Sequence, residues 1–275
     1  MISYLRFVEL GESGKALTKQ VSRIDRENIA PTISEVMSVL SKFGVKRSDI
    51  TPLGSTGKKD SSGDIDLGVK SDPVVAYFKT PDLPSALKLL RVHLQEAFGE
   101  CKYFFGTQLT IPVQIKNQDR FQNNLFVQVD LMFTPSLKAA SFYYHSPSQG
   151  ESDYSGMYRT MLLMSIAINA NRVDKDNNQV LRYWVDKHRG LIRGLETTDG
   201  LKRIASDQQT ISDDPTKIVH TLLGPGFDSS YANSYESLLR AIKSPNFIWR
   251  KSTPDIITTF KSILTKQHIQ IPPGI

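Results

Sequence analysis

Apolar residues recur at helical spacing in two stretches of the first half of the chain. Residues 31–43 predict a helix with Pro31 in its first turn and Gly44 directly after its end. One face of this helix collects its apolar side chains, which are Ile33, Val36, Leu40 and Phe43. Residues 81–99 predict a second helix, with Gly99 as its stop.

Runs rich in apolar and β-branched residues predict strands around these helices. The expected strands are residues 46–53, 64–70, 102–105 continuing through 109–115, and 124–134. In the strand 64–70, Ile65, Leu67 and Val69 share one face, which we expect to be core. The polar link 116–120 predicts a hairpin between the last two strands.

The pattern of polar and apolar residues changes within residues 136–154. Beyond this segment the pattern predicts helices at 154–170, from Pro215 to near Gly224, at 234–242 and from Thr253 onward, and one basic hairpin at 180–195. A methionine-rich stripe of the first of these helices is expected to be core, namely Met157, Met161, Met164 and Ile168. We therefore predict an α/β (α+β) fold, with a mixed sheet flanked by helices in residues 1–140 and a mainly helical domain in residues 141–275.

Composition and charge narrow the class of protein. The formal net charge is +6 and the pI is about 9.2, which favours anionic partners mildly; basic residues spread over a solvated surface are the alternative. A lone cysteine, Cys101, excludes an internal disulfide framework and fits a reducing cytoplasm. No apolar run is long enough to cross a bilayer, and the N-terminus lacks the layout of a signal peptide, so we expect a cytoplasmic protein without membrane contact.

Two acidic residues, Asp64 and Asp66, belong to the strand predicted at 64–70. Side chains alternate across a strand, so both carboxylates project from the same face. Neighbouring carboxylates repel each other unless a cation lies between them, and Mg²⁺, which prefers oxygen ligands, is the usual one. Gly54 and Ser55 lie just upstream, where a bare backbone and a hydroxyl can meet a phosphate.

A third acid, Asp130, interrupts a strand that is otherwise almost wholly apolar. A charge in a buried strand is costly unless it is paired or bound to a metal. A structural salt bridge is one explanation. The other, which we favour, is that Asp130 shares a cation with Asp64 and Asp66.

Together, Gly54-Ser55, Asp64-Ile65-Asp66 and Asp130 resemble the pattern of the DNA polymerase β-like nucleotidyltransferase superfamily. That pattern is an apolar residue followed by Gly-Gly or Gly-Ser, a short spacer, Asp/Glu-x-Asp/Glu, and a third acid on a later strand. The match covers residues 33–134. The long stretch between the second and third acids leaves room for an inserted helix and extra strands, as in larger members of the superfamily.

The resemblance implies a transferase that moves a nucleoside monophosphate from an NTP, such as ATP, to a hydroxyl acceptor and releases pyrophosphate. It implies two Mg²⁺ ions, with Mn²⁺ as a substitute. Asp64 and Asp66 would hold the ion on the triphosphate, and Asp130 would join them around a second ion that activates the acceptor hydroxyl. Gly54 and Ser55 would meet the β- or γ-phosphate.

Further residues are candidate helpers of this reaction. Lys58, in the loop 56–63, fits phosphate contact, and Arg159 could reach the triphosphate, with a surface role as its alternative. Three basic residues of the second half could guide an anionic acceptor or form an ordinary solvated turn, namely Lys187, His188 and Arg189. Three tyrosines could stack a base or simply pack, namely Tyr143, Tyr144 and Tyr154.

Two other readings of the acidic motif stay open. A non-catalytic module on the same fold would bind a nucleotide or nucleic acid without turnover. A structural calcium loop around Asp64 and Asp66 is a third reading, which the strand-like flanks and the missing EF-hand pattern disfavour. For an enzyme, the acceptor is open among an RNA 3′ end, a protein hydroxyl, a small molecule and a second nucleotide, as are the preferred NTP and the oligomeric state.

Overall fold

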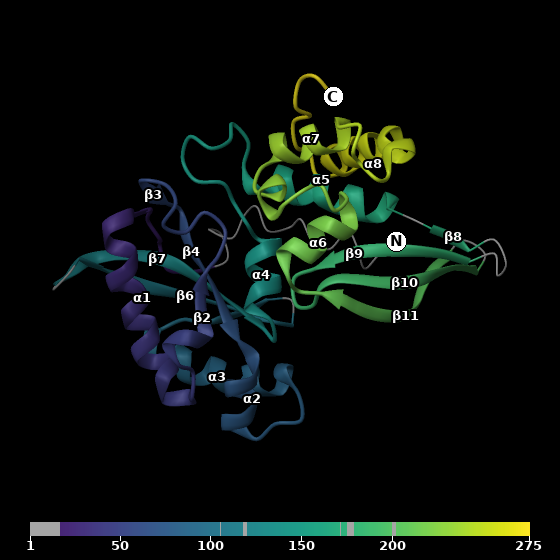
Figure 1. Ribbon diagram of the computed structural model, residues 1–275. Helices are drawn as coiled ribbons and strands as arrows, with labels where there is room; N and C mark the ends of the chain where they lie inside the picture. Colours follow the sequence, from purple (N-terminus) through teal and green to yellow (C-terminus); the bar gives the residue numbers. More distant parts are fainter. Residues whose placement is uncertain (1–16, 105, 118–119, 171, 175–178, 200–201) are drawn as a thin grey trace. The chain divides into compact units, whose positions relative to one another are not determined.

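The computed structural model describes residues 17–275, apart from 105, 118–119, 171, 175–178 and 200–201 (Figure 1). The described chain forms two compact units, of which the first ends at Ser141 and the second begins at Phe142. The protein is mixed α/β, as predicted. In the described ranges, no helix combines the length and the apolar character needed to span a membrane.

A five-stranded mixed sheet forms the centre of the first unit, in the order β2-β4-β7-β6-β5. Its strands are β2 (Ile50–Pro52), β4 (Asp64–Lys70), β5 (Lys102–Phe104), β6 (Gln108–Asn117) and β7 (Arg120–Thr134). β4 and β7 are parallel, and the other neighbours are antiparallel. The predicted hairpin is confirmed, since β6 and β7 pair up to Asn117 and Arg120. A separate two-stranded sheet joins β1 (Ile24–Asp25) to β3 (Ser61–Ser62).

One face of the five-stranded sheet carries the core of the first unit. Ile65, Leu67 and Val69 of β4 have no exposed surface, which confirms the predicted core face. Among the helices that share this core are α1 (Arg26–Leu40) and α3 (Leu83–Phe98), drawn beside the sheet in Figure 1. The opposite face of β4 therefore remains for the two aspartates.

The first predicted helix is real but begins earlier than expected. Pro31 lies inside α1 rather than in its first turn. The preceding turn is helical because Ile29 is buried and the Arg26 amide donates to the Asp60 carbonyl at 2.9 Å. A 3₁₀ turn, Ser41–Phe43, follows α1, and Gly44 ends it in the left-handed conformation.

Two other boundaries in the first unit differ from prediction. The strand expected from residue 46 begins only at Ile50, because Arg47–Asp49 form a 3₁₀ turn in which Asp49 Oδ2 accepts a hydrogen bond from the Lys46 amide at 2.9 Å. Helix α2 (Ser71–Phe78) was not predicted. Its sequence combines a proline, adjacent valines and aromatic residues, which are weak helix formers, so tertiary packing decides its state.

The second unit combines the predicted helices with a sheet that was predicted only in part. This unit holds a four-stranded antiparallel sheet in the order β11-β10-β9-β8. The strands are β8 (Arg172–Asp174), β9 (Gln179–Asp186), β10 (Gly190–Asp199) and β11 (Lys202–Ser212). The basic hairpin predicted at 180–195 is confirmed as β9 and β10, whereas β11 lacks the apolar alternation that would have revealed it.

Helices build the rest of the second unit. They are α5 (Gly156–Asn169), α6 (Pro215–Leu222), α7 (Tyr235–Lys243) and α8 (Thr253–Lys266), with 3₁₀ turns at Ser229–Ala232 and Arg250–Ser252; α4 (Leu137–Tyr143) precedes them across the unit boundary. Asp214 caps α6 by accepting a hydrogen bond from the Lys217 amide. The predicted methionine stripe of α5 is core only in part: Met161 is buried and Met164 packs against the core, whereas Met157 is exposed.

Candidate functional site

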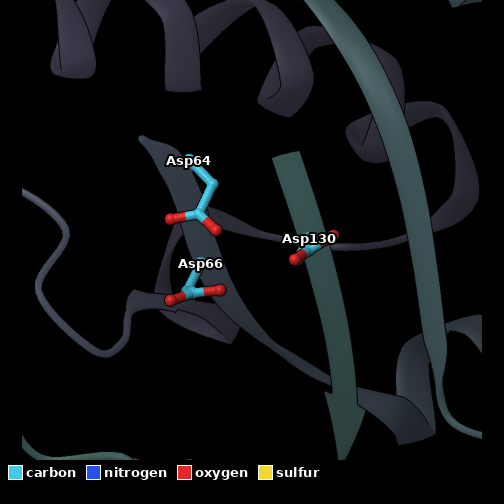
Figure 2. A group of neighbouring side chains, drawn as sticks. All are labelled: Asp64, Asp66 and Asp130. Carbon is cyan, nitrogen blue, oxygen red and sulfur yellow. The ribbon is translucent and has the colours of Figure 1, made fainter. Parts of the chain in front are cut away.

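The pairing of β4 with β7 brings the three predicted acids together. Asp66 stands opposite Asp130 in the parallel register, so both side chains leave the same face of the sheet. Asp64 lies two residues earlier on that face. Each carboxylate offers one oxygen such that the three oxygens lie within 4.8 Å of one another. Figure 2 shows the three side chains on these neighbouring strands.

Burial and mutual repulsion make this cluster electrostatically costly when it is ionised. Burial raises the pKa of Asp66 well above its ordinary value, and the charges of Asp64 and Asp130 raise it further. Burial, with a contribution from Asp64, raises the pKa of Asp130 to about 6, although hydrogen bonds from Thr110 and Gln128 oppose the shift. The charge of the cluster therefore has to be balanced by bound protons or by a cation.

The donor set fits a hard divalent cation. Its ligand atoms are all carboxylate oxygens, which Mg²⁺, Mn²⁺ and Ca²⁺ prefer, and no histidine or cysteine belongs to the group. Across the described residues no second group of this kind occurs. The arrangement can hold a metal ion, and the carboxylates alone leave the identity of that ion to experiment.

The turn before β4 is tied to the second aspartate. Gly54 adopts the left-handed conformation with a φ of 59°, and a β-carbon placed there would lie 2.7 Å from Asp66 Oδ2. The amide of Asp66 donates to Thr56 Oγ1 at 2.9 Å, and its carbonyl accepts from the Leu53 amide at 2.9 Å. These contacts bring Gly54 and the following residue, Ser55, beside the acidic cluster.

Lys58 lies in the same turn and is half-buried. Its amide donates to the Ser55 carbonyl at 3.0 Å, which gives the turn a compact shape. The backbone therefore places Gly54, Ser55 and Lys58 in one short segment directly before the strand of the aspartates.

Arg159 is buried inside the second unit. It belongs to α5 in the second unit and is 1% exposed, so the alternative of a surface role is wrong. Its Nε donates to the Ala232 carbonyl at 2.6 Å and its Nη1 to the Tyr143 carbonyl at 3.2 Å. Its guanidinium carbon also lies 4.6 Å from the Phe142 ring centroid. These contacts hold the guanidinium within its own unit, and contact with a triphosphate stays a prediction.

The other helper candidates also lie in the second unit. The basic residues form the turn between β9 and β10, where Asp186 Oδ1 accepts hydrogen bonds from the amides of His188 and Arg189. Burial lowers the pKa of Lys187, and it lowers that of His188 to about 4. The tyrosines pack as the simpler alternative predicted: Tyr143 is 3% exposed, and Tyr154 lies against Tyr158 and Tyr235.

Sequence reasoning missed two polar residues beside Asp130. Thr110 Oγ1 donates to Asp130 Oδ1 at 2.5 Å, and Gln128 Nε2 lies 3.3 Å and 3.2 Å from the two carboxylate oxygens. Both side chains are 1% exposed. The available signal was the same one that revealed Asp130, namely a polar residue in an apolar strand.

Comparison with known proteins gives no independent classification. No protein-family model matches the chain, and a search of curated proteins finds no match either. The resemblance to the polymerase β-like superfamily therefore rests on the residues of the cluster and of the preceding turn.

Proposed function

We propose that the protein is a metal-dependent nucleotidyltransferase of the polymerase β-like kind. It would transfer a nucleoside monophosphate from an NTP to a hydroxyl acceptor and release pyrophosphate. One observation carries the proposal: three carboxylates converge from two parallel strands beside a glycine turn whose backbone abuts one of them. A structural calcium loop is a poorer explanation, because its ligands would come from one local segment rather than from distant strands.

Each residue of the cluster has a role that follows from its position. Asp64 and Asp66 would share a cation that accompanies the triphosphate. Asp130 would complete the cluster and accept the proton of the acceptor hydroxyl as its oxygen attacks the α-phosphorus. When bound, Mg²⁺ supplies charge stabilisation for the entering and the leaving oxygen.

The turn before β4 would bind the leaving group. Gly54 allows the backbone to approach the β- or γ-phosphate closely, and the Ser55 amide and hydroxyl offer hydrogen-bond donors. Lys58 adds positive charge in the same segment. Bond formation between the acceptor oxygen and the α-phosphorus breaks the bond to the bridging oxygen, so pyrophosphate leaves with the two phosphates held at this turn.

A labelling experiment tests the proposal. The full chain is incubated with each NTP carrying label in the α-phosphate, with Mg²⁺ or Mn²⁺, in the presence and absence of bulk RNA. We expect the α-label to enter an acceptor. In a parallel incubation with γ-labelled NTP, the label should appear only in pyrophosphate. Identification of the labelled pool distinguishes RNA from protein, nucleotide and small-molecule acceptors.

Matched variants make the result specific to the cluster. The double variant Asp64→Asn/Asp66→Asn should reduce the rate of transfer by orders of magnitude, because catalysis of this kind consists mostly of positioning and charge stabilisation. Asp72→Asn is the control, since Asp72 is an exposed carboxylate in the first turn of α2. Nucleotide binding without transfer by the wild type would favour a binding module instead, and equal transfer by the double variant would refute the assignment of the site.

A further inference from the structure

Buried polar side chains form a layer beside Asp130, on the same face of the sheet. It consists of Gln108, Thr110 and Gln128, which are 7%, 1% and 1% exposed. Thr110 of β6 stands opposite Asp130 in the antiparallel register, and Gln128 precedes Asp130 by two residues on the same face of β7. Buried polar groups require hydrogen-bond partners, and in this layer the partners converge on Asp130.

The hydrogen bonds in this layer distinguish the two oxygens of Asp130. Oδ1 accepts from the Thr110 hydroxyl at 2.5 Å and is also 3.3 Å from Gln128 Nε2. Gln108 Nε2 donates to Thr110 Oγ1 at 3.4 Å, so the Thr110 proton is directed to Asp130. Oδ2 lies 3.2 Å from Gln128 Nε2 and accepts no hydrogen bond from Thr110.

We propose that Thr110 and Gln128 are positioning residues that hold Asp130 in one orientation, with Oδ1 anchored and Oδ2 presented to a divalent cation. This proposal rests on the proposed metal site of the nucleotidyltransferase. A metal site works well only when its ligands are held in the productive geometry by partners behind them. Asp130 has two such partners on two strands, so its side chain loses little freedom when the cation binds.

The side-chain amide of Gln128 is a second, independent indication of a divalent cation at this site. Its Nε2 is committed to Asp130, which assigns the other amide atom as the oxygen. This Oε1 is buried and has no hydrogen-bond partner in the described chain. An unpaired buried acceptor costs about 1–3 kcal/mol. Mg²⁺ and Mn²⁺ keep part of their hydration shell in proteins, and a hydrated cation at Asp130 carries the donors that this oxygen lacks.

Mn²⁺ binding to the full chain tests the proposal, measured by titration calorimetry and by the loss of the free Mn²⁺ paramagnetic resonance signal. Thr110→Val removes the hydroxyl while keeping the shape of the side chain, and Thr110→Ser keeps the hydroxyl. Gln128→Met removes the amide at similar length. We expect Thr110→Val and Gln128→Met to weaken Mn²⁺ binding about 10- to 100-fold, and Thr110→Ser to restore most of the affinity.

Kinetics supply a readout that a purely structural role would not move. Since neither residue belongs to the Gly54–Ser55 turn, kcat at saturating Mn²⁺ should fall in Thr110→Val and Gln128→Met while KM for the NTP stays unchanged. Equal Mn²⁺ affinity of Thr110→Val, Gln128→Met and the wild type would overturn the proposal. A wild type that binds no Mn²⁺ would overturn it as well.

The two proposals fail in different ways. If the wild type binds Mn²⁺ but transfers label from no NTP, the proposed function is wrong, whereas the positioning proposal stands or falls on the Mn²⁺ affinities. If the wild type transfers label and both variants behave like it, the positioning proposal is wrong and the function stands. Folding of each variant is checked by its unfolding midpoint in EDTA.

Discussion

Gly54 and Asp66 are in such close contact that position 54 has no room for a side chain: a β-carbon there would lie 2.7 Å from Asp66 Oδ2. The backbone at Gly54 is also left-handed, with a φ of 59°. Gly57 separates the effect of the left-handed backbone from that of the close contact. It lies in the same turn with a φ of 73°, but a β-carbon there would meet nothing within 4 Å. The contact therefore links the shape of the turn to the position of a metal-ligand candidate.

Gly54→Ala should damage the site more than Gly57→Ala does. Both substitutions force alanine into the left-handed region, at a cost of about 1–2 kcal/mol. Only Gly54→Ala also displaces the Asp66 carboxylate, so we expect Mn²⁺ affinity and nucleotide transfer to fall by about tenfold or more beyond the control. Comparable losses in the two variants would mean that the contact between Gly54 and Asp66 is unimportant for the site.

Asp130→Asn should stabilise the protein in the absence of metal while it abolishes transfer. The folded-state pKa of Asp130, about 6, lies above its unfolded value of about 3.9. The folded state then holds the proton more tightly, so the contribution of Asp130 to stability is fully present below about pH 4 and is lost as the pH rises through about 6. Above that range the ionised carboxylate costs about 3 kcal/mol, which a neutral asparagine avoids.

Urea unfolding in EDTA between about pH 4 and pH 8 measures this effect. The asparagine amide finds an acceptor in Gln128 Oε1 once the Gln128 amide rotates, so the variant keeps its hydrogen bonds. Asp72→Asn, which alters an exposed carboxylate, is the control and should leave the pH dependence unchanged. A lower stability of Asp130→Asn than of the wild type near pH 8 would contradict the electrostatic account.

Mg²⁺ or Mn²⁺ should raise the melting temperature of the wild type near neutral pH. A ligand at about 100 times its Kd adds about 2.7 kcal/mol of stability, provided that it binds the folded state alone. The gain should shrink towards about pH 5, because the raised pKa values of Asp66 and Asp130 make protons compete with the cation. Thermal melts with and without metal check this, with Asp64→Asn/Asp66→Asn expected to show no gain at any pH.

Arg159→Met should destabilise the second unit and leave Mn²⁺ binding intact. The substitution removes two hydrogen bonds and leaves the buried Ala232 carbonyl without its guanidinium donor, whereas the Tyr143 carbonyl keeps the hydrogen bond from Thr160 Oγ1 at 3.0 Å. A hydrogen bond from a charged group is worth about 1.5–3 kcal/mol. Unfolding measurements should therefore show a loss of several kcal/mol. An unchanged stability together with a raised KM for the NTP would instead support the original prediction that Arg159 contacts the triphosphate.

Sequence-based prediction was most accurate where the alternation of side chains along a strand is sufficient to assign the structure. Strand β4 could be predicted to the residue, because alternation separates Ile65 and Leu67 from Asp64 and Asp66. Asp130 could be singled out because an acid in an apolar strand violates that rule. What could not be predicted is the parallel register of β4 and β7, which depends on pairing between distant segments.

The same limit explains the misses. The role of Thr110 could not be predicted because it depends on the strand register that places Thr110 opposite Asp130. Gln128 lies two residues before Asp130 on the same strand and could have been found from alternation alone. The burial of Arg159 could not be predicted either, because its acceptors are the carbonyls of Tyr143 and Ala232, which no local pattern connects to it. In the second unit, β11 is mostly polar and is defined by its partner strand rather than by its own composition.

The parallel register of β4 and β7 also determines which misfolded states are available to the chain. A shift of β7 by one residue would turn Asp130 into the apolar core and expose Val129 in its place. Such a state would lose its packing and scatter the carboxylates in the same step. Hydrophobic packing therefore disfavours the shifted register, and the same packing that stabilises the native sheet also positions the acidic cluster.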